Sequence, residues 1–145
     1  MAIVIGSDHG GFELKEVLSA HLKAKGLEVV DVGCYDTNSV DYPDIAAKAC
    51  EKVTGGECEW GIVVCGTGIG ISMAANKVKG IRCALVSNEY SAEMTKRHNN
   101  ANMLALGGRV TGPDLAKNIV DAYIKAEFEG GRHQNRIDKI SALEG

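Results

Sequence analysis

The sequence predicts an α/β fold in which helices cover both faces of one parallel sheet. Short apolar segments alternate along the chain with longer segments whose apolar residues recur at helical spacing. The apolar segments contain almost no polar positions, as is typical of parallel strands that are buried on both faces. Repeated strand and helix units of this kind form a single parallel sheet between layers of helices.

Three strands are predicted in the first half of the chain, at residues 2–6, 27–33 and 60–65. A helix is predicted over residues 12–25, because its apolar side chains share one face before Gly26 ends it. Pro43 can take the first position of a second helix, which extends to Gly55.

Two further strands are predicted in the second half, at residues 81–87 and 103–107. Residues 73–77 are compatible with a short helix, and Asn88 is a candidate N-cap for a helix through Arg97. The segment Thr111-Gly112-Pro113-Asp114 is expected to begin a final long helix. With 145 residues, the chain is predicted to be a single domain, residues 1–145.

Composition argues against several classes of partner and location. The net charge of −3 and the pI near 5.8 provide no general field for nucleic acid or an anionic membrane. The N-terminal segment lacks the basic leader of a signal peptide, and no apolar stretch is long enough for a membrane span. The five cysteines are an odd number without C-x-x-C spacing, which argues against disulfides and structural zinc. We expect a cytoplasmic protein with reduced thiols.

The most informative segment is the glycine-rich sequence after the third predicted strand, Cys65-Gly66-Thr67-Gly68-Ile69-Gly70. At a strand-to-helix turn, glycines let backbone N–H groups point outward and hold an anion. The spacing fits neither a P-loop, which requires a lysine after its last glycine, nor the dinucleotide fingerprint G-x-G-x-x-G. From the loop alone, an anion cradle beside a reactive thiol and a plain tight turn beside a buried cysteine remain equally open.

Four chemically capable side chains lie at the ends of different predicted strands. Asp8 and His9 follow the first strand, Cys65 ends the third, and Arg109 follows the fifth. In parallel sheets ligands bind beyond the carboxyl ends of the strands, so we expect these four side chains on one edge. Their convergence favours a functional role for Cys65.

Six segments together closely resemble the type B ribose-5-phosphate isomerase family, over essentially the whole chain. They are Gly6-Ser7-Asp8-His9-Gly10-Gly11, Asp41-Tyr42-Pro43, Cys65-Gly66-Thr67-Gly68-Ile69-Gly70-Ile71-Ser72, Ala74-Ala75-Asn76-Lys77, Arg97-His98-Asn99 and Gly130-Gly131-Arg132-His133-Gln134-Asn135-Arg136. The resemblance implies a five-stranded Rossmann-like α/β/α sandwich with three layers. It also implies a homodimer or tetramer with sites shared between subunits, and neither a metal nor an organic cofactor.

The resemblance implies a role for each matching residue. Cys65 would be the base, the loop with Gly66, Gly68 and Gly70 would stabilise an enediolate, and His98 would open the sugar ring. Contacts with the sugar or its phosphate are implied for Asp8, His9, Tyr42, Asn99, Arg109, Arg132 and Arg136. Some family members carry a glutamate later in the loop in place of the cysteine, but Ile71 stands there in this chain. The chain therefore follows the cysteine pattern.

These roles agree with the chemistry of aldose-ketose isomerisation. One base can move a proton between adjacent carbons, and backbone N–H groups at a helix start favour a thiolate. Thr67 could relay a proton between the substrate oxygens or only cap the following helix, and both alternatives remain open. His98 could open the ring or only stabilise the C-terminal end of its helix.

The spacing of Arg132 and Arg136 leaves two interpretations open. If the segment is helical, residues four apart lie on one face and could bind a phosphate dianion together. Alternatively, the two arginines form a solvated basic face that pairs with Glu129.

We therefore predict reversible isomerisation of D-ribose 5-phosphate and D-ribulose 5-phosphate through a cis-enediolate. One alternative is an isomerase of allose 6-phosphate or galactose 6-phosphate, because an added hydroxymethylene group changes the depth of a pocket rather than its chemistry. A less favoured alternative is a non-catalytic sensor of sugar phosphates or nucleotides, since a fold alone does not establish activity.

Overall fold

The computed structural model describes residues 2–145 and has a five-stranded parallel sheet with the strand order β2-β1-β3-β5-β4. The strands are β1 (Ala2–Ser7), β2 (Val29–Asp31), β3 (Cys58–Cys65), β4 (Cys83–Leu85) and β5 (Met103–Gly107). The three central strands are buried almost throughout, because helices cover both of their faces. This confirms the predicted parallel sheet with two helical layers.

The two edge strands are shorter than predicted. Only residues 29–31 pair in β2 and only residues 83–85 in β4, whereas the sequence predicted residues 27–33 and 81–87. Each edge strand pairs on one side alone, so its ends gain no second set of hydrogen bonds. Asn76 occupies the free edge of β4, where its side chain bonds both the N–H and the C=O of Cys83 at 2.8 and 2.9 Å.

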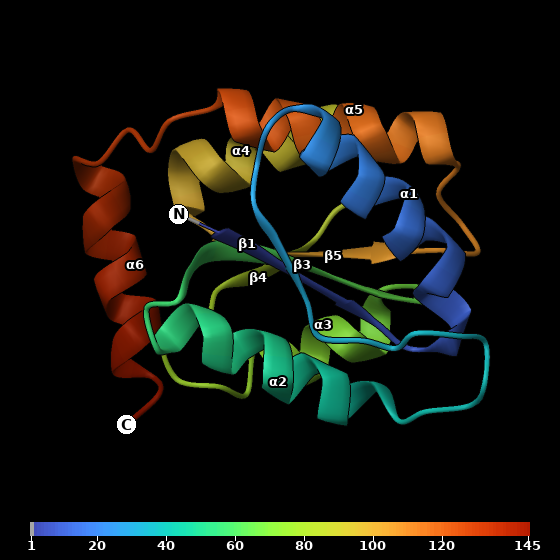
Figure 1. Ribbon diagram of the computed structural model, residues 1–145. Helices are drawn as coiled ribbons and strands as arrows, with labels where there is room; N and C mark the ends of the chain where they lie inside the picture. The colour runs from blue at the N-terminus through green and yellow to red at the C-terminus, as the bar shows by residue number, and fades with distance from the viewer. Residues whose placement is uncertain (1) are drawn as a thin grey trace.

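The helices are η1 (His9–Gly11), α1 (Phe12–Ala24), α2 (Tyr42–Thr54), α3 (Ile69–Ala75), α4 (Glu89–Asn99), α5 (Pro113–Lys125) and α6 (Arg132–Ala142). Helices α1, α4 and α5 cover one face of the sheet, and α2 and α3 cover the other (Figure 1). Leu14, Leu18 and Leu22 of α1 are buried in the first layer, as predicted.

The C-terminal part differs from the predicted single long helix. Helix α5 ends at Lys125, where Ala126 adopts an extended backbone, and α6 begins only after Gly130 and Gly131, both at positive φ. Figure 1 shows α6 outside the two layers, standing beside the amino ends of the strands. Helix α2 begins one residue earlier than predicted, so Pro43 takes its second position.

Topology divides the loops between two ends of the sheet. A helix that connects parallel strands runs antiparallel to them, so it begins near their carboxyl ends and finishes near their amino ends. The start of α3 after Cys65 therefore lies at the carboxyl ends, whereas His98 at the end of α4 lies at the amino ends, beside α6.

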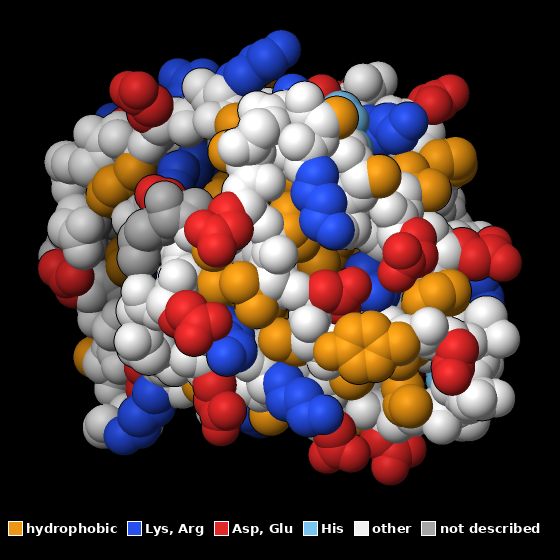
Figure 2. Space-filling view, in the orientation of Figure 1, with side chains coloured by type: hydrophobic (Ala, Val, Ile, Leu, Met, Phe, Trp, Pro, Cys, Tyr) orange, Lys and Arg blue, Asp and Glu red, His pale blue; other side chains and the backbone are white. Residues whose placement is uncertain are grey.

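The face drawn in Figure 2 carries interspersed acidic and basic side chains and no extended area of one charge. Among residues 2–145, none of the helices combines the length and the hydropathy that a bilayer crossing requires.

Candidate active site

The Cys65 thiol lies at the start of α3 and contacts the backbone of the glycine-rich loop. Cys65 is the last residue of β3, and its side chain is 5 % exposed. The backbone N–H of Gly68 donates to the Cys65 Sγ at 3.1 Å. A backbone N–H at a helix start stabilises negative charge on sulfur. The arrangement therefore joins the predicted thiol to the predicted anion-stabilising backbone.

Glycines at this end leave room for close packing of the chain. Gly68 adopts φ +81°, and a Cβ there would lie 2.8 Å from the Leu106 carbonyl carbon. The Arg109 side chain lies against Gly66, where a Cβ would be 3.1 Å from its Nη1, and against Gly10, where a Cβ would be 3.4 Å from its Cζ. The backbone N–H of Arg109 also donates to the Gly66 carbonyl at 2.9 Å. Arg109 is thus held beside the loop.

Asp8 and His9 follow β1 at the same end of the sheet. The Asp8 carboxylate is almost fully buried and accepts the Gly11 N–H at 3.1 Å, which caps the turn η1. The Val40 N–H donates to the His9 Nδ1 at 3.2 Å. A backbone N–H can only donate, so Nδ1 is the acceptor and a neutral His9 carries its proton on Nε2. His9 is therefore arranged to donate a hydrogen bond from Nε2.

Tyr42 and Thr67 complete this group of residues. The Tyr42 ring lies over Gly70, where a Cβ would be 2.7 Å from the ring Cζ. The backbone N–H of Ile69, the first residue of α3, donates to the Thr67 Oγ1 at 3.2 Å. We call Asp8, His9, Tyr42, residues 65–70 and Arg109 the carboxyl-end region.

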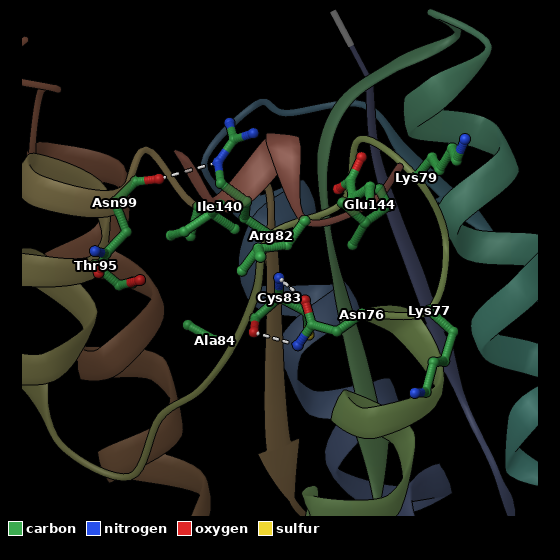
Figure 3. A pocket seen from close by; sticks show the side chains of 13 residues that line it. Asn76, Lys77, Lys79, Arg82, Cys83, Ala84, Thr95, Asn99, Ile140 and Glu144 are labelled. Carbon is green, nitrogen blue, oxygen red and sulfur yellow. Dashed lines mark hydrogen bonds between the residues drawn. The ribbon is translucent and has the colours of Figure 1, made fainter. Parts of the chain in front are cut away.

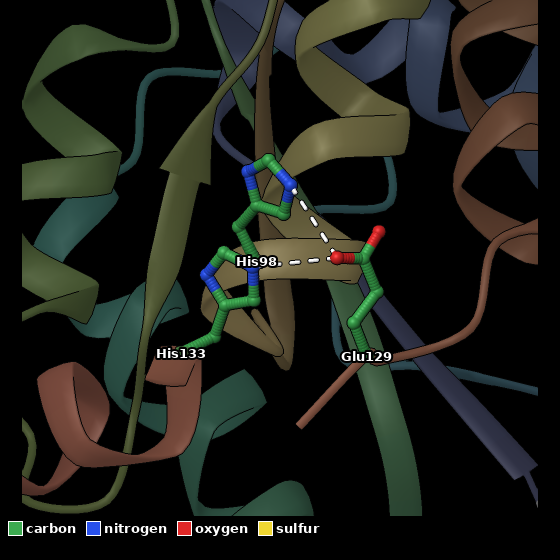
Figure 4. Close-up of side chains that lie close together, drawn as sticks. All are labelled: His98, Glu129 and His133. Atoms are coloured by element: carbon green, nitrogen blue, oxygen red, sulfur yellow. Dashed lines mark ion pairs between the residues drawn. The ribbon is translucent and has the colours of Figure 1, made fainter. Parts of the chain in front are cut away.

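His98 lies at the amino ends of the strands, in a cluster with Glu129 and His133 (Figure 4). The rings of His98 and His133 are stacked, with centroids 4.2 Å apart and 12° between their planes. The Nε2 atoms of both histidines face the same carboxylate oxygen, Oε1 of Glu129, at 3.8 and 3.3 Å. His98 is partly exposed, whereas His133 is buried.

Glu129 is held in this cluster by Arg97. Its Oε2 accepts from the Arg97 Nε at 2.7 Å, and its backbone N–H donates to the Arg97 carbonyl at 3.0 Å. The hydrogen bond from the Arg97 guanidinium lowers the pKa of the Glu129 carboxyl, and the nearby positive charges act in the same direction. Glu129 therefore presents a carboxylate to the two histidines.

Arg132 and Arg136 are exposed on α6, the helix that also carries His133. Glu129 pairs with Arg97 and the two histidines. Within residues 2–145, neither Arg132 nor Arg136 forms an ion pair with Glu129, which was one of the two interpretations of their spacing. Both guanidinium groups thus remain available for a ligand.

Asn99 follows His98 and lines a pocket of about 640 Å³ at the same end of the sheet (Figure 3). The pocket lies between the end of α3, the start of β4, the end of α4 and the end of α6. The Arg82 Nε donates to the Asn99 carbonyl at 3.0 Å. We call His98, Asn99, Glu129, Arg132, His133 and Arg136 the amino-end region.

The other cysteines are also free, and the Cys34 thiol donates to the Asp36 carbonyl at 3.2 Å. Burial raises the pKa of the Cys50 thiol to about 11, and burial also raises the pKa of Cys83 and Cys58. Thiols of this kind are inert at neutral pH. Unlike Cys65, they contact no glycine-rich loop.

The structure places Asp8, His9, Cys65 and Arg109 at one end of the sheet, as the sequence predicted. It places His98, Asn99, Arg132 and Arg136 at the opposite end. The sequence interpretation gave no catalytic or binding role to Glu129 or His133. Their i, i+4 spacing was a local signal, but α6 begins at Arg132, so Glu129 lies outside the helix. Only the contact between the ends of α4 and α6 brings His98 to them.

Comparison with known proteins identifies the fold and the family. A solved structure of ribose-5-phosphate isomerase B from Clostridium thermocellum is 57% identical and superposes with a TM-score of 0.98, covering 99% of this chain and 97% of that chain. The ribose-5-phosphate isomerase B of Escherichia coli (strain K12) is 50% identical over 142 residues, which are 98% of this chain and 95% of the relative.

A structure of ribose-5-phosphate isomerase B from Mycoplasma genitalium, with bound ribulose-5-phosphate, is 48% identical with a TM-score of 0.93. The two chains match over 99% of this chain and 95% of that one. Residues 3–140 also match the model of the Ribose/Galactose Isomerase family. The chain, with its α/β sandwich and its thiol at the loop, therefore belongs to the Ribose/Galactose Isomerase family.

Proposed function

We propose that this chain interconverts D-ribose 5-phosphate and D-ribulose 5-phosphate through a cis-enediolate, with Cys65 as the base. The observation that carries the proposal is the 3.1 Å hydrogen bond from the Gly68 N–H to the Cys65 Sγ at the start of α3. It supports a thiolate at the point where a loop of backbone N–H groups can also hold an oxyanion. Relatives with the same fold are ribose-5-phosphate isomerases, one of them with bound ribulose-5-phosphate.

The proposed reaction needs one base and a stabilised oxyanion. The Cys65 thiolate takes the proton from C2 of the open-chain aldose, and the electron pair moves to give the enediolate. The resulting thiol returns the proton to C1, which gives the ketose. A placed base contributes about 10²–10⁴ in rate and one oxyanion donor about 10²–10³, so both are required. Thr67 either relays a proton between the two substrate oxygens or only caps α3.

The direct test is proton exchange. Cys65→Ala should abolish both turnover and the exchange of the substrate α-proton with solvent, while the affinity for a phosphate-containing inhibitor changes little. Normal turnover by this variant would reject Cys65 as the base. The sensor alternative would be favoured if the wild type shows no turnover and Cys65→Ala keeps both ligand binding and biological output.

We further propose that a second copy of the chain completes the site. His98 as ring-opening residue and Arg132 and Arg136 as phosphate ligands lie in the amino-end region, whereas Cys65 lies in the carboxyl-end region. One substrate cannot reach both ends of the same sheet. A homodimer, or a tetramer built from two such dimers, can place the amino-end region of one copy against the carboxyl-end region of the other.

Mixed dimers test this arrangement. Cys65→Ala and His98→Asn homodimers should each be inactive, but a dimer with one copy of each variant contains one intact site. Random reassortment of equal amounts should then restore about a quarter of wild-type activity. The control is two separate preparations of Cys65→Ala, mixed in the same way, which should stay inactive. Failure of the mixed dimers to recover activity would contradict a shared site.

The alternative substrate is a hexose phosphate. The matching family includes galactose isomerases by its description, so an isomerase of galactose 6-phosphate or allose 6-phosphate remains the second candidate. Measuring kcat/KM for ribose 5-phosphate, allose 6-phosphate and galactose 6-phosphate separates the two, and a hexose preference would reverse our choice. We place the reaction in the cytoplasm, in keeping with five free thiols.

A further inference from the structure

We infer that His98, Glu129 and His133 form a binding site for a transition-metal dication such as Zn²⁺ or Co²⁺, and that the bound metal inhibits isomerisation. The inhibition rests on the proposed ring-opening role of His98. The metal binding rests on the cluster alone, so the two parts can fail separately.

Two imidazoles and one carboxylate are a ligand set that zinc uses in proteins. One ring nitrogen of His98, one of His133 and a carboxylate oxygen of Glu129 all lie within 4.8 Å of one another. Tetrahedral ligand atoms at zinc bond lengths lie about 3.3 Å apart. The distances to Glu129 Oε1 are 3.3 Å from His133 and 3.8 Å from His98, so the spacing between each histidine and the carboxylate is near this value.

The buried nitrogen of His133 lacks a hydrogen-bond partner. His133 is 6 % exposed. Among the buried side-chain nitrogen and oxygen atoms of residues 2–145, the Nε2 of His133 is the one that forms no hydrogen bond. The 3.3 Å contact with Glu129 does not satisfy it as a hydrogen bond. A buried polar atom without a partner needs an explanation, and a bound ion that accepts its lone pair is one.

The stacked rings show which side chain must move. Two nearly parallel imidazoles cannot both direct an in-plane lone pair at one ion, because their planes do not meet nearby. The His133 side chain is 8 % exposed and fixed by packing, whereas that of His98 is 40 % exposed. We therefore expect His98 to rotate out of the stack towards Glu129 when metal binds, which removes its Nε2 from the substrate.

The local charge permits a cation. Glu93 and Glu129 share Arg97, so these three side chains carry a net charge of −1. Arg132 and Arg136 on the same helix as His133 oppose a cation and limit the affinity. We expect a dissociation constant of roughly 1–100 µM rather than the tight binding of a structural zinc site.

The experiment is a titration of tag-free protein with Co²⁺, whose visible absorption reports imidazole and carboxylate ligation, followed by displacement with Zn²⁺. His133→Ala and Glu129→Gln should each weaken binding at least tenfold. Two controls should bind as the wild type does. His21→Ala removes a histidine paired with Asp121 elsewhere, and Cys65→Ser removes the thiol that could bind metal by itself.

Each outcome decides one part of the inference. Unchanged binding by both His133→Ala and Glu129→Gln, or binding lost only in Cys65→Ser, would overturn the metal site. Glu129 is partly exposed, so Glu129→Gln remains informative even if His133→Ala does not fold. Co²⁺ binding that leaves isomerisation of the wild type unchanged would keep the site but overturn the inhibition. Inhibition that a chelator reverses, with the expected variant pattern, supports both parts.

Discussion

The two regions of the candidate site use different parts of the chain for their chemistry. In the carboxyl-end region the backbone does most of the positioning, because the Gly68 N–H contacts Cys65 and glycines let Arg109 and Tyr42 pack against the loop. In the amino-end region, side chains do most of the positioning, because the Glu129 carboxylate faces His98 of α4 and His133 of α6.

This difference determines how each region responds to substitution. A backbone cradle depends on φ angles and on the absence of Cβ atoms, so an added methyl group displaces several atoms together. A side-chain cluster on helix ends depends on individual charges, which can be removed one at a time. We therefore expect the largest effects at the loop and graded effects around Glu129.

Gly68→Ala should have the largest effect. The substitution places a side chain at φ +81° and puts a Cβ within 3.0 Å of Leu106 backbone atoms, so the loop must shift and its N–H leaves Cys65. Loss of one such donor costs about 10²–10³ in kcat, and the strained φ costs about 1–2 kcal/mol of stability. Steady-state kinetics and thermal unfolding measure both.

Gly112→Ala is the matched control for that experiment. Gly112 precedes α5 at φ −67°, and no heavy atom lies within 4 Å of a Cβ built there. Its kcat should equal that of the wild type. Equal losses in Gly68→Ala and Gly112→Ala would show that the backbone cradle has no special role.

Arg136→Ala should have the second-largest effect, on substrate affinity. Charge-assisted hydrogen bonds contribute about 1.5–3 kcal/mol each, which predicts a KM raised about ten- to a hundredfold. Lys139→Ala, on the same helix, should change KM little. Binding of the non-phosphorylated sugar should not depend on Arg136. If sugar and sugar phosphate weaken equally, Arg136 is not a phosphate ligand.

Glu129→Gln should have a smaller effect, on ring opening. Glutamine keeps the shape but removes the charge that faces His98 and His133, and exposed charge pairs of this kind contribute little, so kcat for cyclic ribose 5-phosphate should fall by about three- to tenfold. The control is Glu93→Gln, which also removes a partner of Arg97 but faces neither histidine. In pre-steady-state assays, open-chain aldehyde should restore the rate of Glu129→Gln. A rate that stays low with open-chain substrate would contradict a role in ring opening.

The fold was predictable wherever the signal was local. Predominantly apolar segments predicted all five strands, and the signal is clearest for the three central strands, which are buried almost throughout. The extent of β2 and β4 was not predictable, since pairing at a sheet edge depends on one neighbour only. The separate helix α6 was missed because the break between Lys125 and Arg132 is marked only by Gly130 and Gly131.

The candidate site divides in the same way. The ends of the strands predicted that Asp8, His9, Cys65 and Arg109 would meet, because parallel strands end at a common edge. The role of Glu129 depends on where α6 packs against α4, and that tertiary contact has no pattern within either helix. Periodicity and spacing therefore placed the carboxyl-end region but not the contacts within the amino-end region.

The smallest expected effect is a dependence of the amino-end region on pH. The Arg97 guanidinium lowers the pKa of the Glu129 carboxyl in the folded chain, so its ionised form is favoured there relative to the unfolded chain. Its stabilising contribution is complete above the unfolded value of about 4.3 and disappears as the pH falls through the lower folded value. Protection factors of α6 amides, which are exchange rates corrected for the intrinsic effect of pH, are measured at pH values on both sides of this window. They should fall on acidification by a smaller factor in Glu129→Gln than in the wild type. Because Arg97 keeps its charge throughout, the difference between the two proteins isolates the Glu129 carboxylate. Identical acid responses would mean that packing, rather than this ion pair, holds α6 against α4.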